Sequence, residues 1–245
     1  MPKLLLAVAG LFLLPLSWQA WQQLGRGTPH WREARWDSAG LAPDPARLRE
    51  AVVQIYAARA WGWKGVFAVH SWIAFKRPAA AAWERYEVVG WGVRHGLPAV
   101  RRNLRPPDAR WAGNPPRLLA DIRGPEAAAL IPRIERAIAS YPYRDRYRSW
   151  PGPNSNTFLA HILRSVPEIG IELPPEALGK DWLGATRWLA RSPSGTGLQL
   201  SLWGLLGLTL AREEGIELTF LGLNLGLDPF DPAVKLPGIG RLGLR

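Results

Sequence analysis

Residues 150–159 read Trp-Pro-Gly-Pro-Asn-Ser-Asn-Thr-Phe-Leu, and we expect the functional centre of the chain in this stretch. Two prolines around Gly152 exclude helix and sheet and predict a tight bend. Residues 154–156 are polar and favour helix N-caps, and apolar residues then recur at helical spacing as far as Val166. The pattern predicts a helix over 154–166 whose first turn combines free N–H groups with polar side chains. Enzymes place nucleophiles and anions at such helix starts. The alternative is a well-capped helix without chemistry.

Upstream of this helix, alternating apolar and polar residues predict three strands: 53–57, 66–76 and 83–92. A turn around Pro78 would join the last two as a hairpin. In that register Glu87 lies about opposite Trp72 and diagonal to His70, on the same face. The sequence therefore predicts an imidazole and a carboxylate within reach of each other. The alternative is a half-buried histidine in a sheet.

Two further elements complete the predicted fold. A strand is expected over residues 117–123, and Gly124-Pro125-Glu126 marks a helix start, with proline at the first position. Together these elements predict an α+β fold, an antiparallel sheet with packed helices at about 125–140 and 154–166.

The last third of the chain is rich in glycine and leucine. Apolar runs at 198–211 and 215–227 flank the polar Arg212-Glu213-Glu214. This pattern predicts a long β-hairpin over 198–227 that packs in the core, and its glycines permit bending. A ribbon that touches a membrane is the alternative. Residues 51–245 are thus expected to form a single α+β domain.

The N-terminus is apolar behind one positive charge. Lys3 precedes an uncharged stretch from Leu4 to Ala20, typical of a signal peptide or a short membrane anchor. Trp18 occupies the −3 position of a cleavage site after Ala20, which favours an uncleaved anchor over 1–21. Residues 22–50 are polar and predict a linker or arm. We expect the bulk of the chain to be exported.

Composition limits the classes of function. The chain of 245 residues has no cysteine, so it has no disulfide, thiolate nucleophile or Cys-based metal site. Its net charge is +11, but the arginines are scattered, so no nucleic-acid groove is indicated and anionic lipid is the simpler partner. The alternative, which the scatter favours, is an arginine-rich solvated surface. Tryptophan, with 14 copies, is abundant as in bilayer interfaces and ligand clefts.

Several stretches resemble a family of uncharacterised envelope proteins from proteobacteria. They are Asp37–Pro45, Tyr86–Gly92, Trp150–Phe158, Ser194–Gly197 and Lys235–Gly240. The resemblance covers nearly the whole chain after the predicted anchor. It implies no activity, because the family has none assigned.

A more remote resemblance does imply chemistry. In circularly permuted papain-like hydrolases and lecithin-retinol-acyltransferase-like enzymes, a strand carries a histidine in patterns such as His-Trp-Gly-Ile, and the nucleophile follows at a helix start reading Asn-Cys-x-x-Phe. Val69–Ile73 is similar to the first pattern and Asn154–Phe158 to the second. The resemblance implies a papain-like fold with Ser155 in the place of the cysteine and Glu87 as the third member. Serine is a far weaker acid than cysteine, so His70 would have to act as a general base.

Two functional hypotheses follow. The first is a membrane-anchored envelope protein whose papain-like cleft binds a small-molecule, peptide or lipid ligand without catalysis. The alternative is a Ser–His hydrolase or acyltransferase for an amide or ester of envelope peptide or lipid. The candidate catalytic residues are Ser155, His70 and Glu87, and the candidate ligand-binding residues are Asn154, Asn156, Trp72 and Trp150.

No metal or cofactor is predicted, because the sequence has neither a His/Asp/Glu metal cluster nor a glycine-rich phosphate loop. The expected partner is membrane lipid, reached through the N-terminal segment, and no nucleic acid is expected. The expected location is the bacterial inner membrane, with the bulk of the chain facing the periplasm.

Overall fold

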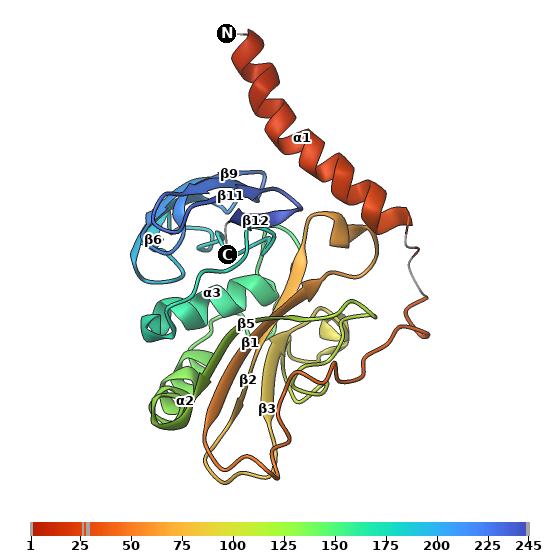
Figure 1. The fold of residues 1–245 in the computed structure, drawn as a ribbon, viewed down its shortest axis with the longest axis vertical. Helices are drawn as coiled ribbons and strands as arrows, with labels where there is room; N and C mark the ends of the chain where they lie inside the picture. The colour runs from red at the N-terminus through yellow and green to blue at the C-terminus, as the bar shows by residue number, and fades with distance from the viewer. Residues whose placement is uncertain (1, 26, 28–29, 244–245) are drawn as a thin grey trace.

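A computed structural model describes residues 2–25, 27 and 30–243, without the side chains of residues 2–8 and 24. Within these residues the chain forms two antiparallel sheets, and the helix α3 (Ser155–Ser165) contacts both of them (Figure 1). The predicted α+β class, with antiparallel strands and packed helices, is confirmed.

The first sheet has the strand order β4-β3-β2-β1-β5. Its strands are β1 (Val52–Arg59), β2 (Val69–Lys76), β3 (Glu84–Val88), β4 (Val100–Arg102) and β5 (Arg117–Arg123). Strands β2 and β3 form the predicted hairpin, in which Ile73 pairs with Tyr86 and Phe75 pairs with Glu84. This register confirms the predicted pairing, because its continuation places Glu87 beside Trp72.

Two helices cover one face of this sheet. The helix α2 (Gly124–Ala139) begins with proline in its first turn and buries Leu130, Ile134 and Ile138. It packs against β1, β5 and α3, and α3 packs against β2 and β3. Both helices lie where the sequence predicts them. Short 3-10 turns complete the helical segments: η1 (Gly62–Val66), η2 (Val93–His95) and η3 (Pro167–Ile169).

The opposite face of the first sheet is covered by irregular chain. Trp36, Ala42 and Leu48 pack against buried aromatic residues of the sheet. The buried carboxylate of Asp108 accepts hydrogen bonds from Ser38 Oγ at 2.7 Å and from the backbone N–H of Leu41 at 2.6 Å. The segment predicted as a linker over 22–50 is therefore a packed arm from residue 30 onward, and its first residues belong to a helix.

The C-terminal third is not the single hairpin predicted over 198–227. It forms a second sheet of order β12-β11-β10-β9-β8-β7-β6. Each predicted long strand is folded in two, at Trp203-Gly204 and at Leu221-Gly222, where all four residues have positive φ. Such left-handed pairs make tight hairpin turns, and glycine supplies that conformation without steric cost. The strands are β6 (Leu189–Arg191), β7 (Gly197–Leu202), β8 (Leu206–Ala211), β9 (Gly215–Phe220), β10 (Leu223–Asp228), β11 (Ala233–Leu236) and β12 (Gly240–Gly243).

The N-terminal segment is one helix, α1 (Pro2–Gly25), longer than the anchor predicted over 1–21. The helix contacts the globular part: Gln23 is buried, and the ring of Phe12 lies 5.9 Å from that of Phe220. Met1 and the side chains of residues 2–8, including that of Lys3, lie outside the description. Among the described residues, no helix is both long and apolar enough to cross a bilayer.

One buried side chain ties α3 to the first sheet. Asn156, which is 2% exposed, accepts a hydrogen bond from Ser71 Oγ at 2.8 Å. Its amide nitrogen donates to the carbonyl oxygens of Val69 at 3.0 Å and Leu178 at 2.9 Å. Ser71 and Val69 flank His70 in β2, so Asn156 holds the N-terminus of α3 beside that histidine.

We expect Asn156→Ala to lower the free energy of unfolding by about 2–4 kcal/mol, because it leaves the buried hydroxyl of Ser71 and the carbonyl of Val69 without this partner. Urea unfolding followed by tryptophan fluorescence measures this loss. The control Thr186→Ala removes an exposed hydroxyl and should change stability by less than about 0.5 kcal/mol. Equal stability of the two variants would contradict the anchoring role of Asn156.

Candidate functional site

A pocket of about 1080 Å³ opens where the N-terminus of α3 meets the ends of β2 and β3. Its walls are mainly aromatic and aliphatic, and its polar atoms are few. Its lining includes His70, Trp91, Trp111, Trp150, Ser155 and Leu221. Pockets of this size and character bind small molecules or segments of larger ones.

The pocket contains a histidine that is paired with a buried carboxylate. His70 Nε2 lies 2.9 Å from Glu87 Oε2, and Glu87 is fully buried. Arg85 approaches the same carboxylate with two nitrogens, Nη2 at 3.0 Å from Oε2 and Nε at 2.8 Å from Oε1. The guanidinium of Arg85 also lies over the ring of Trp72 at 4.2 Å and donates to the carbonyl of Pro106 at 2.8 Å. These contacts fix the carboxylate and thereby the imidazole.

The electrostatics favour a neutral imidazole beside an ionised carboxylate. Burial lowers the pKa of His70 below its ordinary value, although Glu87 opposes the shift. Burial acts to raise the pKa of Glu87, but the Arg85 charge and the His70 hydrogen bond outweigh it and leave that pKa lowered. At neutral pH the network therefore carries the Arg85–Glu87 ion pair and an uncharged histidine.

The hydrogen bond to Glu87 also selects the tautomer. A carboxylate can only accept, so Nε2 of His70 carries the proton and Nδ1 carries a lone pair, as inferred from the network. Within the described residues Nδ1 has no hydrogen-bond partner, and it is not among the polar atoms sealed from solvent. The ring stacks on Trp111 with centroids 3.5 Å apart. The basic nitrogen of His70 is therefore oriented and available to a group in the pocket.

Ser155 is the first residue of α3 and lies in the same pocket. The preceding residue, Asn154, caps the helix: its side chain accepts from the backbone N–H groups of Asn156 at 3.0 Å and Thr157 at 3.1 Å. In the described part of the chain neither the hydroxyl nor the backbone N–H of Ser155 makes a hydrogen bond, to His70 or to any other residue. A hydroxyl and an N–H without a hydrogen-bond partner therefore lie beside the pocket, at the positive end of a helix.

The candidate ligand-binding residues have different roles. Trp72 is completely buried, stacks on Tyr56 with centroids 5.6 Å apart and donates Nε1–H to the carbonyl of Pro107, and it is not among the residues that line the pocket. Asn154 and Asn156 border the pocket, but cap and helix–sheet contacts occupy their amides. Trp150 lines the pocket with its ring about half exposed and its Nε1 bound to Leu221 O at 3.0 Å.

Sequence reasoning missed two groups. Arg85 lies two residues from Glu87 and therefore on the same face of β3. The alternation of side chains along this strand could have predicted its contact with Glu87. No local pattern predicts the second group, the aromatic wall, in which Trp91 and Trp111 stack with centroids 5.3 Å apart. Trp36 contacts both of these rings. These tryptophans come from loops whose positions depend on tertiary packing.

The fold and the site together define an α+β protein with a histidine–carboxylate pair and a serine in one apolar pocket. The chain belongs to the family described as "Protein of unknown function (DUF3750)", whose model matches residues 50–182. That match contains every candidate site residue and ends before the second sheet. No curated protein and no solved structure matches the chain significantly. In the residues that the structure describes, no cluster of three His, Cys, Asp or Glu side chains is arranged to hold a metal ion.

We expect the pKa of His70 to fall further in Glu87→Gln, because both effects of Glu87 on it raise the pKa. In the wild type the unfolded chain binds this proton more readily than the folded one, so the free energy of unfolding should decrease as pH drops below about 6.5. Titration of the histidine ring signals by NMR measures the pKa. In the control Glu135→Gln, which removes a surface partner of Arg77, His70 should titrate as in the wild type. A raised His70 pKa in Glu87→Gln would show that Glu87 does not stabilise the imidazolium.

Proposed function

We propose that the pocket is the active site of a hydrolase or acyltransferase for an ester or amide, with Ser155 as nucleophile and His70 as general base. The observation that carries this proposal is the shared pocket: His70, whose imidazole is oriented by Glu87, and Ser155, whose hydroxyl is unpaired, both line it. Glu87 would hold the imidazole in the required tautomer and stabilise the imidazolium that forms.

The proposed reaction has two steps. Nδ1 of His70 takes the proton of Ser155 as its Oγ attacks the carbonyl carbon of the substrate. The negative oxygen of the tetrahedral intermediate is stabilised by the free N–H of Ser155 at the helix N-terminus. When the C–O or C–N bond breaks, the proton on Nδ1 passes to the leaving alcohol or amine. Water or an acceptor alcohol or amine, deprotonated by His70, then releases the acyl group from Ser155.

The distance between the two catalytic groups must shorten in this reaction. Ser155 and His70 make no hydrogen bond in the described structure, and such contacts often tighten only in the substrate complex. The chain order, with the histidine in a strand and the nucleophile at a later helix start, supports a permuted papain-like arrangement as part of the proposal. The site differs from the papain-like pattern in having a serine in place of the cysteine, and a serine requires a general base during the attack itself.

The walls of the pocket bear on the substrate. Aromatic and aliphatic side chains such as Trp150, Trp91 and Leu223 favour an apolar acyl part next to the reacting carbonyl. An amide or ester of envelope lipid or peptide fits this description. Membrane anchoring through the N-terminal segment, with the bulk of the chain in the periplasm, belongs to the same proposal.

The second candidate is a binding protein without catalysis. It is favoured by the absence of a Ser155–His70 hydrogen bond and by the tryptophan-rich wall, which suits an apolar or aromatic ligand. In that case the Arg85–Glu87–His70 network would only shape the pocket.

A fluorophosphonate probe on the full-length protein separates the two candidates. We expect the probe to form an adduct at Ser155. The rate of labelling should fall by about 10³-fold or more in Ser155→Ala and in His70→Ala, because nucleophile and base act as a unit. Mass spectrometry locates the adduct. The matched control is Ser149→Ala, since Ser149 also lines the pocket and should not affect labelling.

Stability measurements complete the test. Because Asn154 supplies the cap, Ser155→Ala should change the free energy of unfolding by less than about 0.5 kcal/mol. Loss of labelling in a variant of normal stability therefore reports chemistry and not unfolding. An unlabelled wild-type protein, with Ser155→Asp retaining stability and cellular function, would remove the enzyme and leave the binding protein.

A further inference from the structure

The second sheet has an unusual distribution of polarity. In β9 the exposed residues Ile216, Leu218 and Phe220 alternate with the buried residues Glu217 and Thr219. A sheet with one face on a core and one in water shows the reverse pattern, with apolar residues inside and polar residues outside. The pattern recurs along the sheet, so it is a property of the whole face.

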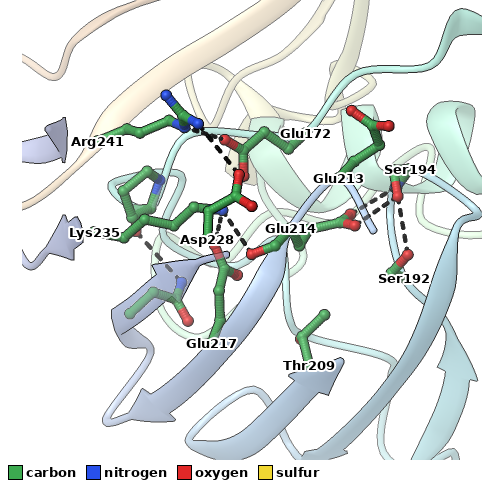
Figure 2. Close-up of polar contacts among 12 residues, drawn as sticks. Glu172, Ser192, Ser194, Thr209, Glu213, Glu214, Glu217, Asp228, Lys235 and Arg241 are labelled. Carbon is green, nitrogen blue, oxygen red and sulfur yellow. Dashed lines mark hydrogen bonds and ion pairs between the residues drawn. The ribbon is translucent and has the colours of Figure 1, made fainter. Parts of the chain in front are cut away.

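The inner face is a network of buried charges, shown in Figure 2. Lys235 contacts Glu172 and Glu217, and its ammonium donates to the carbonyl oxygen of Glu214 at 2.7 Å. Arg241 reaches Asp228 at 3.2 Å. Buried charges require oppositely charged partners, so paired polar side chains fill the inner face of the sheet. The apolar side chains of the same strands are left to point outward.

These outward side chains form continuous rows across the central strands. Strand pairing aligns Leu200 with Leu208, Leu208 with Leu218, and Leu218 with Leu225. We define the outer apolar face by its most exposed members, each between 47% and 59% exposed: Leu189, Leu198, Leu200, Leu206, Leu210, Ile216, Leu218, Phe220, Leu227 and Leu242. Contiguous apolar surfaces of this kind mark sites of protein or membrane interaction.

We propose that the outer apolar face lies on a lipid bilayer. Its side chains are almost entirely aliphatic and offer no hydrogen-bonding group. The hydrocarbon core of a bilayer matches such a surface, whereas an interface with a protein partner would also contain hydrogen bonds. The residues at its margin fit the membrane–water interface: Trp188 and Trp203 are about half exposed and Phe230 is 71% exposed. The proposal concerns the surface and does not depend on any reaction in the pocket.

Charge and continuity support the same occupant. Arg191 and Arg212 are the exposed charged residues within the described strands and turns of the second sheet, and the chain carries a net charge of +11, which complements anionic head groups. The face also continues onto α1, because Phe12 contacts Phe220 and Leu14 on the same helix is 73% exposed. In Figure 1 this helix and the second sheet lie at the same upper end of the molecule.

The test is a fluorescent label on the face, made simple by the absence of cysteine from the chain. Leu218→Cys in the full-length protein is labelled with the environment-sensitive dye NBD and mixed with phosphatidylethanolamine–phosphatidylglycerol vesicles. We expect blue-shifted, brighter emission that is quenched by lipids with a nitroxide on the acyl chain. Leu210→Cys gives a second, independent label on the same face, should one variant fold poorly.

The matched control is Leu97→Cys, whose side chain is 49% exposed in a loop of the first sheet and should stay in water. This design separates the sheet from α1, because a chain held by α1 alone would leave all three labels unchanged on bound vesicles. That result would overturn the proposal. It would also be overturned if the labels at 210 and 218 were already buried in a lipid-free dimer and did not respond to vesicles, since a second copy would then be the occupant.

Discussion

The docking of α3 on β2 through Asn156 is the contact on which the rest of the site depends. Its side chain accepts from Ser71 and donates both amide hydrogens, to Val69 and Leu178, so the helix can neither rotate nor slide without breaking buried hydrogen bonds. Asn154 caps the helix immediately before it. Ser155, held between these two asparagines, is the residue of the first turn whose polar groups remain free for the pocket.

The local parts of this arrangement were readable in the sequence. The alternation in β2 and β3 and the short turn between them set the register, and the register placed Glu87 next to His70. The bend at Pro151 and Pro153 and the polar cluster after it predicted where α3 begins. These features can be predicted from the sequence because they depend on residues that are close together in the chain.

The parts that depended on distant contacts were not readable. Trp72 lies on the same face as His70, but the packed arm and Pro107 bury it, and no local pattern reveals that covering. The second sheet was missed because residues 198–227 read as two long strands, whereas left-handed turns at Gly204 and Gly222 fold each of them back. The polarity of that sheet follows from buried partners such as Glu172, which lies in a different segment.

The pocket and the outer apolar face meet at one turn: Leu221 lines the pocket, and its carbonyl oxygen accepts the indole N–H of Trp150. The central claim is that Ser155 faces the base His70. It is tested most directly by Ser155→Cys, which places a single thiol in the chain. Alkylation rates against pH should give a thiol pKa below about 8.5, and that pKa should rise when His70→Ala is added. The same thiol pKa in both variants would contradict the account.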